Sequence, residues 1–194
     1  FDYSDWNDFD TCTSSCGLDS CPAPAFNEAL ASFSAPALAH VGGHLWVDNN
    51  DAMVSFSSPK LADVDGVWVW GNEVLSSLAL PSVTTLKFLG LGSNHAMHSF
   101  DLSALATVTG KVEITQLPSL TEIGFPSLTA VGYLELVGAD MVLTPNLAAL
   151  THVNGTLHIS SNDSLEALSL PALTEVSGDV HMHHNSSLSS ISWP

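Results

Sequence analysis

Histidines near the C-terminal end are the residues of this chain best suited to chemistry. His158 and His181 occupy equivalent places in two successive sequence repeats, and His183 and His184 follow in the run His-Met-His-His. Neighbouring imidazoles can share a Cu²⁺ or Zn²⁺ ion, since metal–nitrogen bonds of roughly 2.1 Å bring two such ligands to one point. If equivalent residues of successive repeats lie side by side, the sequence predicts a metal site of His158, His181 and His183, with Glu135 one repeat upstream. The alternative is that these histidines are polar residues of a solvated strand.

A repeat of about 23 residues, in places one residue shorter, runs through most of the chain and is typical of solenoids. Residues 150–172 read Leu-x-x-Val-x-Gly-x-Leu-x-Ile-x-x-Asn-x-x-Leu-x-x-Leu-x-Leu-Pro-x, and residues 173–194 repeat this pattern almost position for position. A half unit occupies residues 26–37, and seven full units cover residues 38–194. The full units begin at Leu38, Leu61, Val83, Leu105, Leu128, Leu150 and Leu173.

Each unit contains two short stretches with the pattern of a strand. Leu157 and Ile159 alternate with polar residues, and Leu168 and Leu170 form a second alternating stretch that ends at Pro171. One unit cannot bury its own leucines, whereas stacking places each against its equivalents about 4.8 Å away. We therefore expect an all-β protein, a right-handed β-solenoid of about seven coils in which each coil adds strands to two faces.

Two further columns of the repeat are expected to be architectural. One is a buried ladder of asparagines whose amides bond the backbone of adjacent coils. The other is a set of glycines just before the first strand, where a tight turn would need a positive φ or the absence of a side chain. The ladder comprises Asn27, Asn50, Asn72, Asn94, Asn162 and Asn185. The glycines are Gly43, Gly66, Gly110, Gly155 and Gly178.

This spacing resembles the L domains of the insulin-receptor and epidermal-growth-factor-receptor ectodomains, and of related fungal cell-wall proteins. The resemblance implies a secreted or cell-surface protein, but that family uses one scaffold for hormone binding, receptor dimerisation and wall architecture, so it does not imply one function. The chain departs from the pattern at Leu117 and Ala139, which replace the ladder asparagine, and at Gly90 and Gly92, which lie in the strand of the third coil. It also lacks the receptors' cysteine-rich modules, so receptor signalling is not carried over.

One outward column of the first strands is expected to be the working surface. We predict that it comprises Trp46, Val69, Gly90, Glu113, Glu135, His158 and His181. Exposed aromatic residues often mark contact patches. The predicted partner-binding face, for a protein or a glycan, is Trp46, Val69, Phe88, Glu113 and Glu135. Trp68 and Trp70 are assigned to the core, and the alternative for Trp46 is that a cap or loop covers it.

Enzymatic activity is not expected. The chain has no Gly-x-Ser-x-Gly elbow, phosphate loop or dinucleotide fingerprint. Catalysis would need Glu113 and Glu135 as paired carboxylates for glycoside chemistry. A flat solenoid face lacks the cleft that excludes water and orients a sugar. No catalytic residue or required cofactor is therefore predicted.

The net charge of the chain disfavours some classes of binding partner. Twenty carboxylates stand against three lysines, with no arginine, which gives a formal net charge of −17. Nucleic acids and anionic membranes would repel such a surface, and no apolar run approaches the roughly 20 residues of a membrane span. Calcium is a separate possibility, because four carboxylates cluster near the turns of the first coils, although their spacing is not that of a dedicated loop. These are Asp48, Asp51, Asp63 and Asp65.

The two ends of the chain carry further predictions. Residues 1–25 form a segment rich in Cys and Asp, and we expect it to be a cap stapled by one disulfide among Cys12, Cys16 and Cys21, leaving one thiol free to bridge two chains. The last unit has no capping segment, which fits a fragment, a tolerated exposed coil or a head-to-tail contact between copies. The sequence thus favours a secreted or cell-surface protein that recognises a partner or assembles into a filament or surface layer, with Cu or Zn binding as the alternative.

Overall fold

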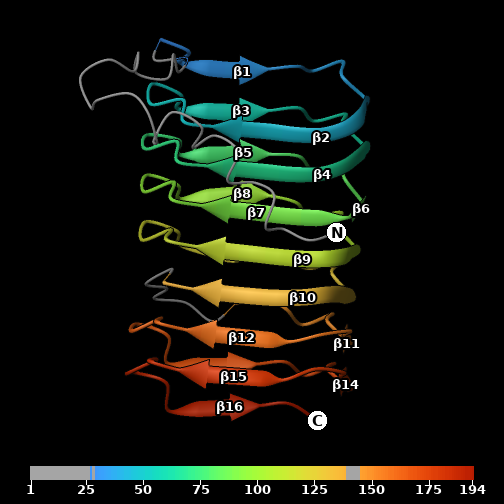
Figure 1. Cartoon of the computed structure of the whole chain (residues 1–194), viewed down its shortest axis with the longest axis vertical. Helices are drawn as coiled ribbons and strands as arrows, with labels where there is room; N and C mark the ends of the chain where they lie inside the picture. The colour runs from blue at the N-terminus through green and yellow to red at the C-terminus, as the bar shows by residue number, and fades with distance from the viewer. Residues whose placement is uncertain (1–26, 28, 139–144) are drawn as a thin grey trace, which may run out of the picture.

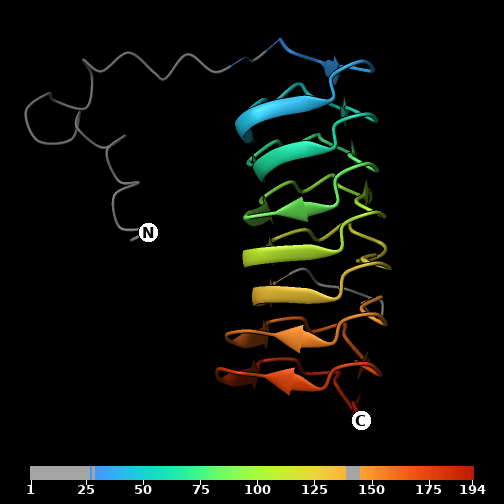
Figure 2. The ribbon, with the colours of Figure 1, turned by 90° about the vertical axis from the view of Figure 1, so that its right-hand side faces the viewer.

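The chain folds into a stack of parallel β coils, as a computed structural model of residues 27, 29–138 and 145–194 shows. All the regular secondary structure in these ranges consists of β-strands, and these ranges contain no helix. The first coil lies at the top of Figure 1 and the last at the bottom, and Figure 2 shows the coils as level layers. The expected right-handed β-solenoid of about seven coils is confirmed. Since the described ranges contain no helix, they also contain none that could span a membrane.

The larger sheet, called here the long sheet, collects the first strands of the coils. All its pairings are parallel, and equivalent positions of successive coils are partners. Its strands are β2 (His40–Asp48), β4 (Asp63–Trp70), β6 (Thr85–Leu86), β7 (Phe88–Gly92), β9 (Thr107–Thr115), β10 (Ala130–Val137), β11 (His152–Val153), β12 (Leu157–Ser160), β14 (Glu175–Val176) and β15 (Val180–His183).

The opposite side of most coils carries a short strand. Four of these strands pair into one sheet: β1 (Ser32–Ser34), β3 (Ser55–Ser57), β5 (Ser77–Ala79) and β8 (Ser99–Asp101). Two more pair near the C-terminal end: β13 (Ala167–Ser169) and β16 (Ser190–Ser192). Between the two groups, a parallel bridge joins Gly124 to Asn146. Because β1 belongs to the half unit and pairs with β3, the stack begins before the first full coil, as predicted.

The core fills the space between the two sides of the coils. Each inward position of the long sheet stacks one aliphatic side chain on the next, and on the opposite side the rings of Phe33 and Phe56 stack at 4.6 Å with planes 8° apart. Among the described residues, every buried side-chain nitrogen and oxygen has a hydrogen-bond partner. One inward column comprises Leu45, Val67, Leu89, Val112, Leu134, Leu157 and Val180.

The predicted asparagine ladder is present. The Nδ2 group of Asn72 donates to the carbonyl of Val47 at 2.9 Å and to Oδ1 of Asn94 at 3.1 Å, while Oδ1 of Asn72 accepts the backbone N–H of Asn50 at 3.0 Å. Asn162 repeats this arrangement toward Asn185. Leu117 interrupts the ladder with a fully buried apolar side chain. Where the asparagine is present, the ladder ties adjacent coils together, and Asn50, Asn72, Asn94 and Asn162 do so as buried side chains.

A column of left-handed residues, which the sequence did not reveal, stands immediately before the ladder position. Each coil has one residue there with φ between 51° and 64°. In every coil but the last, its backbone N–H donates a hydrogen bond to a carbonyl of the next coil. Such a φ favours glycine, yet most of these residues are not glycine. The column comprises Asn49, Gly71, Ser93, Gln116, Gly138, Ser161 and His184.

Of the two reasons predicted for the repeat glycines, the need for a missing side chain is confirmed at Gly110, Gly155 and Gly178, and the positive φ was wrong. Gly110 lies inside β9, and the glycines with positive φ among the described residues are Gly71 and Gly138. A Cβ on Gly110 would lie 2.5 Å from the carbonyl oxygen of Lys87, and one on Gly155 would lie 2.6 Å from that of Gly132. These glycines are needed because the backbones of adjacent coils approach each other too closely for a side chain. The predicted cap, with its three cysteines, lies outside the described residues.

Substitution of Asn72 by leucine tests the ladder, because leucine is the residue that the chain itself uses at position 117. We expect it to lower the free energy of unfolding by about 3 kcal/mol, since buried backbone groups of two neighbouring coils lose their partners. Urea denaturation followed by circular dichroism measures the change. Asn154→Ala, at an exposed asparagine outside the ladder, should cost less than about 0.5 kcal/mol. Equal costs for the two variants would contradict the assigned role of the ladder.

Candidate binding face of the long sheet

The outward side chains of the long sheet form three parallel columns, called here the outer face. The central column comprises Trp46, Trp68, Gly90, Glu113, Glu135, His158 and His181. One flanking column comprises His44, Gly66, Phe88, Lys111 and Tyr133. Thr156 and Asp179 stand at the equivalent positions, immediately before β12 and β15. The other comprises Asp48, Trp70, Gly92, Thr115, Val137, Ser160 and His183.

Six of the seven residues predicted for the central column lie in it, but the prediction that Val69 points outward was wrong. Val69 is 0% exposed and points into the core, and Trp68 stands in its place. Trp68 and Trp70, predicted to be core, are half-buried on the outer face. The cause is the length of the second coil, because Val64 and Val67 are closer in sequence by one position than their partners Val41 and Leu45. Applying the pattern of the longer coils to this shorter coil therefore displaces the assignment of β4 by one residue. A displacement by one residue exchanges the inward and outward faces of a strand.

The first three coils carry an aromatic patch, defined here as His44, Trp46, Trp68, Trp70 and Phe88. Trp46 is 42% exposed, and its ring centroid lies 5.7 Å from that of Trp68 and 5.9 Å from that of Phe88. The rings of Trp68 and Trp70 stack at 4.9 Å with planes 9° apart. His44 contacts Phe88 with centroids 4.8 Å apart. Five rings from three successive coils thus form one continuous surface.

The glycines of the outer face hold this patch in place. A Cβ on Gly90 would lie 2.3 Å from the Trp68 ring, and one on Gly92 would lie 2.3 Å from the Trp70 ring. Likewise, a Cβ on Gly66 would lie 2.5 Å from the Phe88 ring. Each ring therefore occupies the space that a side chain of the neighbouring coil would fill. This explains why the third coil has glycines in its strand.

Coils four and five carry carboxylates that share one lysine. The Nζ group of Lys111 lies 2.9 Å from Oε2 of Glu113 and 2.6 Å from Oε2 of Glu135, and 5.5 Å from the ring centroid of Tyr133. Burial alone would lower the pKa of Lys111, but its hydrogen bonds to Glu135 and Glu113, together with their charges, outweigh this effect and raise the pKa. Lys111 therefore stays protonated, and its single positive charge offsets one of the two negative charges of the pair that the sequence marked for carboxylate chemistry.

Coils six and seven carry the predicted histidine cluster. His158 and His181 are partners on adjacent strands, as expected, but the shortest contact is diagonal: Nε2 of His158 lies 3.3 Å from Nε2 of His183. Glu135 Oε1 lies 3.5 Å from Nδ1 of His158, and Nδ1 of His183 lies 2.8 Å from Nδ1 of His184. Desolvation lowers the pKa of His183, and the charges of His184, His158 and His181 lower it further.

The structure does not assemble a larger ligand set. Within residues 27, 29–138 and 145–194, no three His, Cys, Asp or Glu side chains gather around a common point. Two of the four aspartates considered for calcium are engaged elsewhere: Asp63 pairs with His40 at 2.6 Å, and Asp65 pairs with Lys87 at 3.0 Å. A calcium site therefore finds no support in the described part of the chain.

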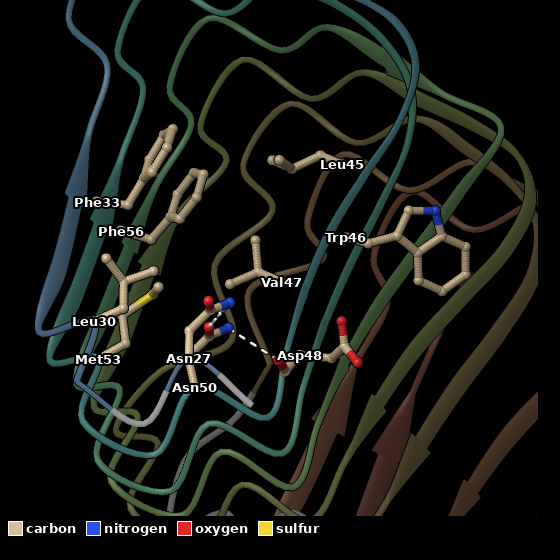
Figure 3. Close-up of a pocket in the computed structure, with 10 residues that line it drawn as sticks. All are labelled: Asn27, Leu30, Phe33, Leu45, Trp46, Val47, Asp48, Asn50, Met53 and Phe56. Carbon is tan, nitrogen blue, oxygen red and sulfur yellow. Dashed lines mark hydrogen bonds between the residues drawn. The ribbon is translucent and has the colours of Figure 1, made fainter. Parts of the chain in front are cut away.

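A cavity of about 200 Å³ opens at the first coil, as Figure 3 shows. The apolar side chains of Leu30, Phe33 and Met53 line it, and Trp46 and Asp48 line it from β2. Its polar lining includes Asn27 and Asn50, whose amides bond each other at 3.1 Å as ladder members. The cavity is thus the upper end of the solenoid core.

Comparisons of the chain with protein-family models, curated proteins and solved structures give no match.

Substitution of Lys111 by methionine tests the charge arrangement at coils four and five. It leaves Glu113 and Glu135 directly opposite each other on adjacent strands, and like charges in such positions are destabilising. We expect a loss of roughly 1 to 2 kcal/mol in the free energy of unfolding, because the pair is partly solvent-screened. Adding Glu113→Gln and Glu135→Gln to this variant should restore most of the loss. A triple variant no more stable than Lys111→Met would refute the arrangement.

Proposed function

We propose that this protein is a non-enzymatic secreted or cell-surface module that recognises a protein or glycan partner through its aromatic patch. The observation that carries the proposal is the continuous set of five rings, with Trp46 42% exposed, on an open sheet face. Aromatic side chains supply much of the energy of contact surfaces, and Trp is enriched among the residues that dominate binding.

The restraint of the rings adds to this argument. Trp68 and Trp70 stack on each other and lie over glycines of the next coil, so their rotamers are largely fixed before any partner arrives. Ordering a side chain on binding costs roughly 0.5–1.5 kcal/mol, and a preorganised surface avoids much of this cost. The patch therefore suits recognition of a flat or extended partner.

The charge around the patch favours a neutral glycan as the first partner to test. None of the three lysines belongs to the patch, and the formal net charge of −17 disfavours anionic ligands. His44 and Asp48 stand beside Trp46 and place hydrogen-bonding groups next to apolar rings. Apolar faces combined with a few polar groups are the composition of sites that fix a ligand's orientation. The secreted or cell-surface setting rests on the resemblance to receptor L domains and on this acidic surface.

Self-assembly is the second candidate, and the ends of the described stack favour it. Val180, Ile191 and Trp193 are 44–46% exposed on the last coil. At the other end, Leu30 is 37% exposed beside the open cavity. Exposed strand edges next to apolar side chains can add the strands of another copy. This arrangement would continue the stack head to tail.

Cosedimentation with insoluble cellulose, chitin and β-1,3-glucan tests recognition. We expect the full chain to bind at least one of these polysaccharides and Trp46→Ala to weaken binding about tenfold, which corresponds to roughly 1.4 kcal/mol. Trp193→Ala is the matched control, because Trp193 is 45% exposed but lies outside the patch. Equal binding by the two variants would contradict the role of the patch, and absence of binding to every polysaccharide would leave a protein as the partner.

Analytical ultracentrifugation and negative-stain microscopy of the same proteins separate the two candidates. Recognition predicts a monomer whose state does not change with Trp46→Ala. Fibres that disappear on Ile191→Asp, at an exposed residue of β16, would instead make assembly the primary function.

A further inference from the structure

We propose that His158 and His183 form a zinc site, with their two Nε2 atoms as the protein ligands. These atoms lie 3.3 Å apart, on β12 and β15 of adjacent coils. Two nitrogens bound to one tetrahedral Zn²⁺ at roughly 2.0–2.1 Å are about 3.4 Å apart. The side chains thus stand at the separation that the ion requires, without a change of rotamer.

The neighbours of each ring favour a lone pair on Nε2. Glu135 Oε1 lies 3.5 Å from Nδ1 of His158, so the negative charge favours a proton on Nδ1. A carboxylate behind a histidine is the usual arrangement that fixes the tautomer of a zinc ligand. Nδ1 of His183 lies 2.8 Å from Nδ1 of His184, and when His183 donates in this bond its Nε2 is also free of a proton. Both Nε2 atoms, 3.3 Å apart, then carry a lone pair that a metal ion can accept.

The surroundings add an attractive field for a cation. Glu135 faces the site from coil five, and Asp179 lies 3.7 Å from His181 on coil seven. Lys111 is the nearest lysine along the outer face. It lies on β9, one coil beyond Glu135, and pairs with Glu113 and Glu135. A divalent ion between coils six and seven therefore meets no uncompensated positive side chain among these neighbours.

The site has open coordination positions. Within the described ranges no third ligand stands at the common point, and the ring of His181 lies 5.9 Å, between centroids, from that of His158. Structural zinc sites are closed by four protein ligands, whereas open sites keep water or another ligand. The bound ion would therefore be exchangeable. Because it joins β12 to β15, it would also stabilise the last coil, whose strand residue Val180 is 46% exposed.

Equilibrium dialysis against ZnCl₂ of the full chain, without a histidine tag, tests this site. We expect one Zn²⁺ per chain, and at least a tenfold weaker affinity in both His158→Gln and His183→Gln. His95→Gln and His152→Gln are matched controls, because these exposed histidines also lie beside carboxylates but on other parts of the coils. Affinity that is unchanged in His158→Gln and His183→Gln, or equally lost in the controls, would overturn the proposal.

Thermal denaturation supplies a second readout. Zn²⁺ should raise the melting temperature of the full chain, since a ligand that binds the folded state stabilises it, and it should not raise that of His183→Gln. His183 is exposed on the last described strand of the long sheet, so this variant should fold even if His158→Gln does not. An equal rise in both proteins would overturn the proposal. The site lies on other coils than the aromatic patch, so its failure leaves the recognition proposal intact.

Discussion

The in-register stacking of parallel coils is the constraint on which the rest of this structure depends. Every strand of the long sheet finds its hydrogen-bond partners in the neighbouring coils, so no coil can satisfy its backbone alone. The same constraint turns each template position into a column. A buried column must suit its neighbours above and below, which explains why Asn72 bonds both adjacent coils and why Leu117 interrupts the ladder without leaving an unsatisfied buried side chain among the described residues.

The columns could be predicted because the repeat is regular, and the failures occurred where it is not. In the shorter coils one position is missing between the two inward side chains, as between Val64 and Val67. The run Val67-Trp68-Val69-Trp70 is apolar on both faces, so hydrophobic alternation could not correct the count. Burial decides it: Val69 is fully buried beneath the surface on which Trp68 lies. The physical information that the sequence lacked was the position of the irregularity within the strand.

Two other features depended on geometry that residue types do not encode. The left-handed corner is occupied by Ser93 and Ser161 as readily as by glycine, because a hydrogen bond from the backbone N–H to the next coil fixes it whatever the side chain. The histidine columns were predictable from the repeat, but the diagonal contact between His158 and His183 depends on rotamers. For the histidines, the sequence therefore predicted which side chains share a face, and the structure was needed to show which of them are in contact.

The two halves of the outer face have different electrostatic requirements. Glutamates on adjacent strands would repel each other, and Lys111 between Glu113 and Glu135 removes that repulsion. His158 extends the same chain of contacts from Glu135 toward the last coil. The polar half is thus partly compensated from within, and it keeps a net negative charge that would repel an anionic macromolecule. The aromatic half, whose glycines let the rings lie on the sheet, offers apolar contact area. A partner that fits this face is therefore selected by the shape of its apolar surface more than by its charge.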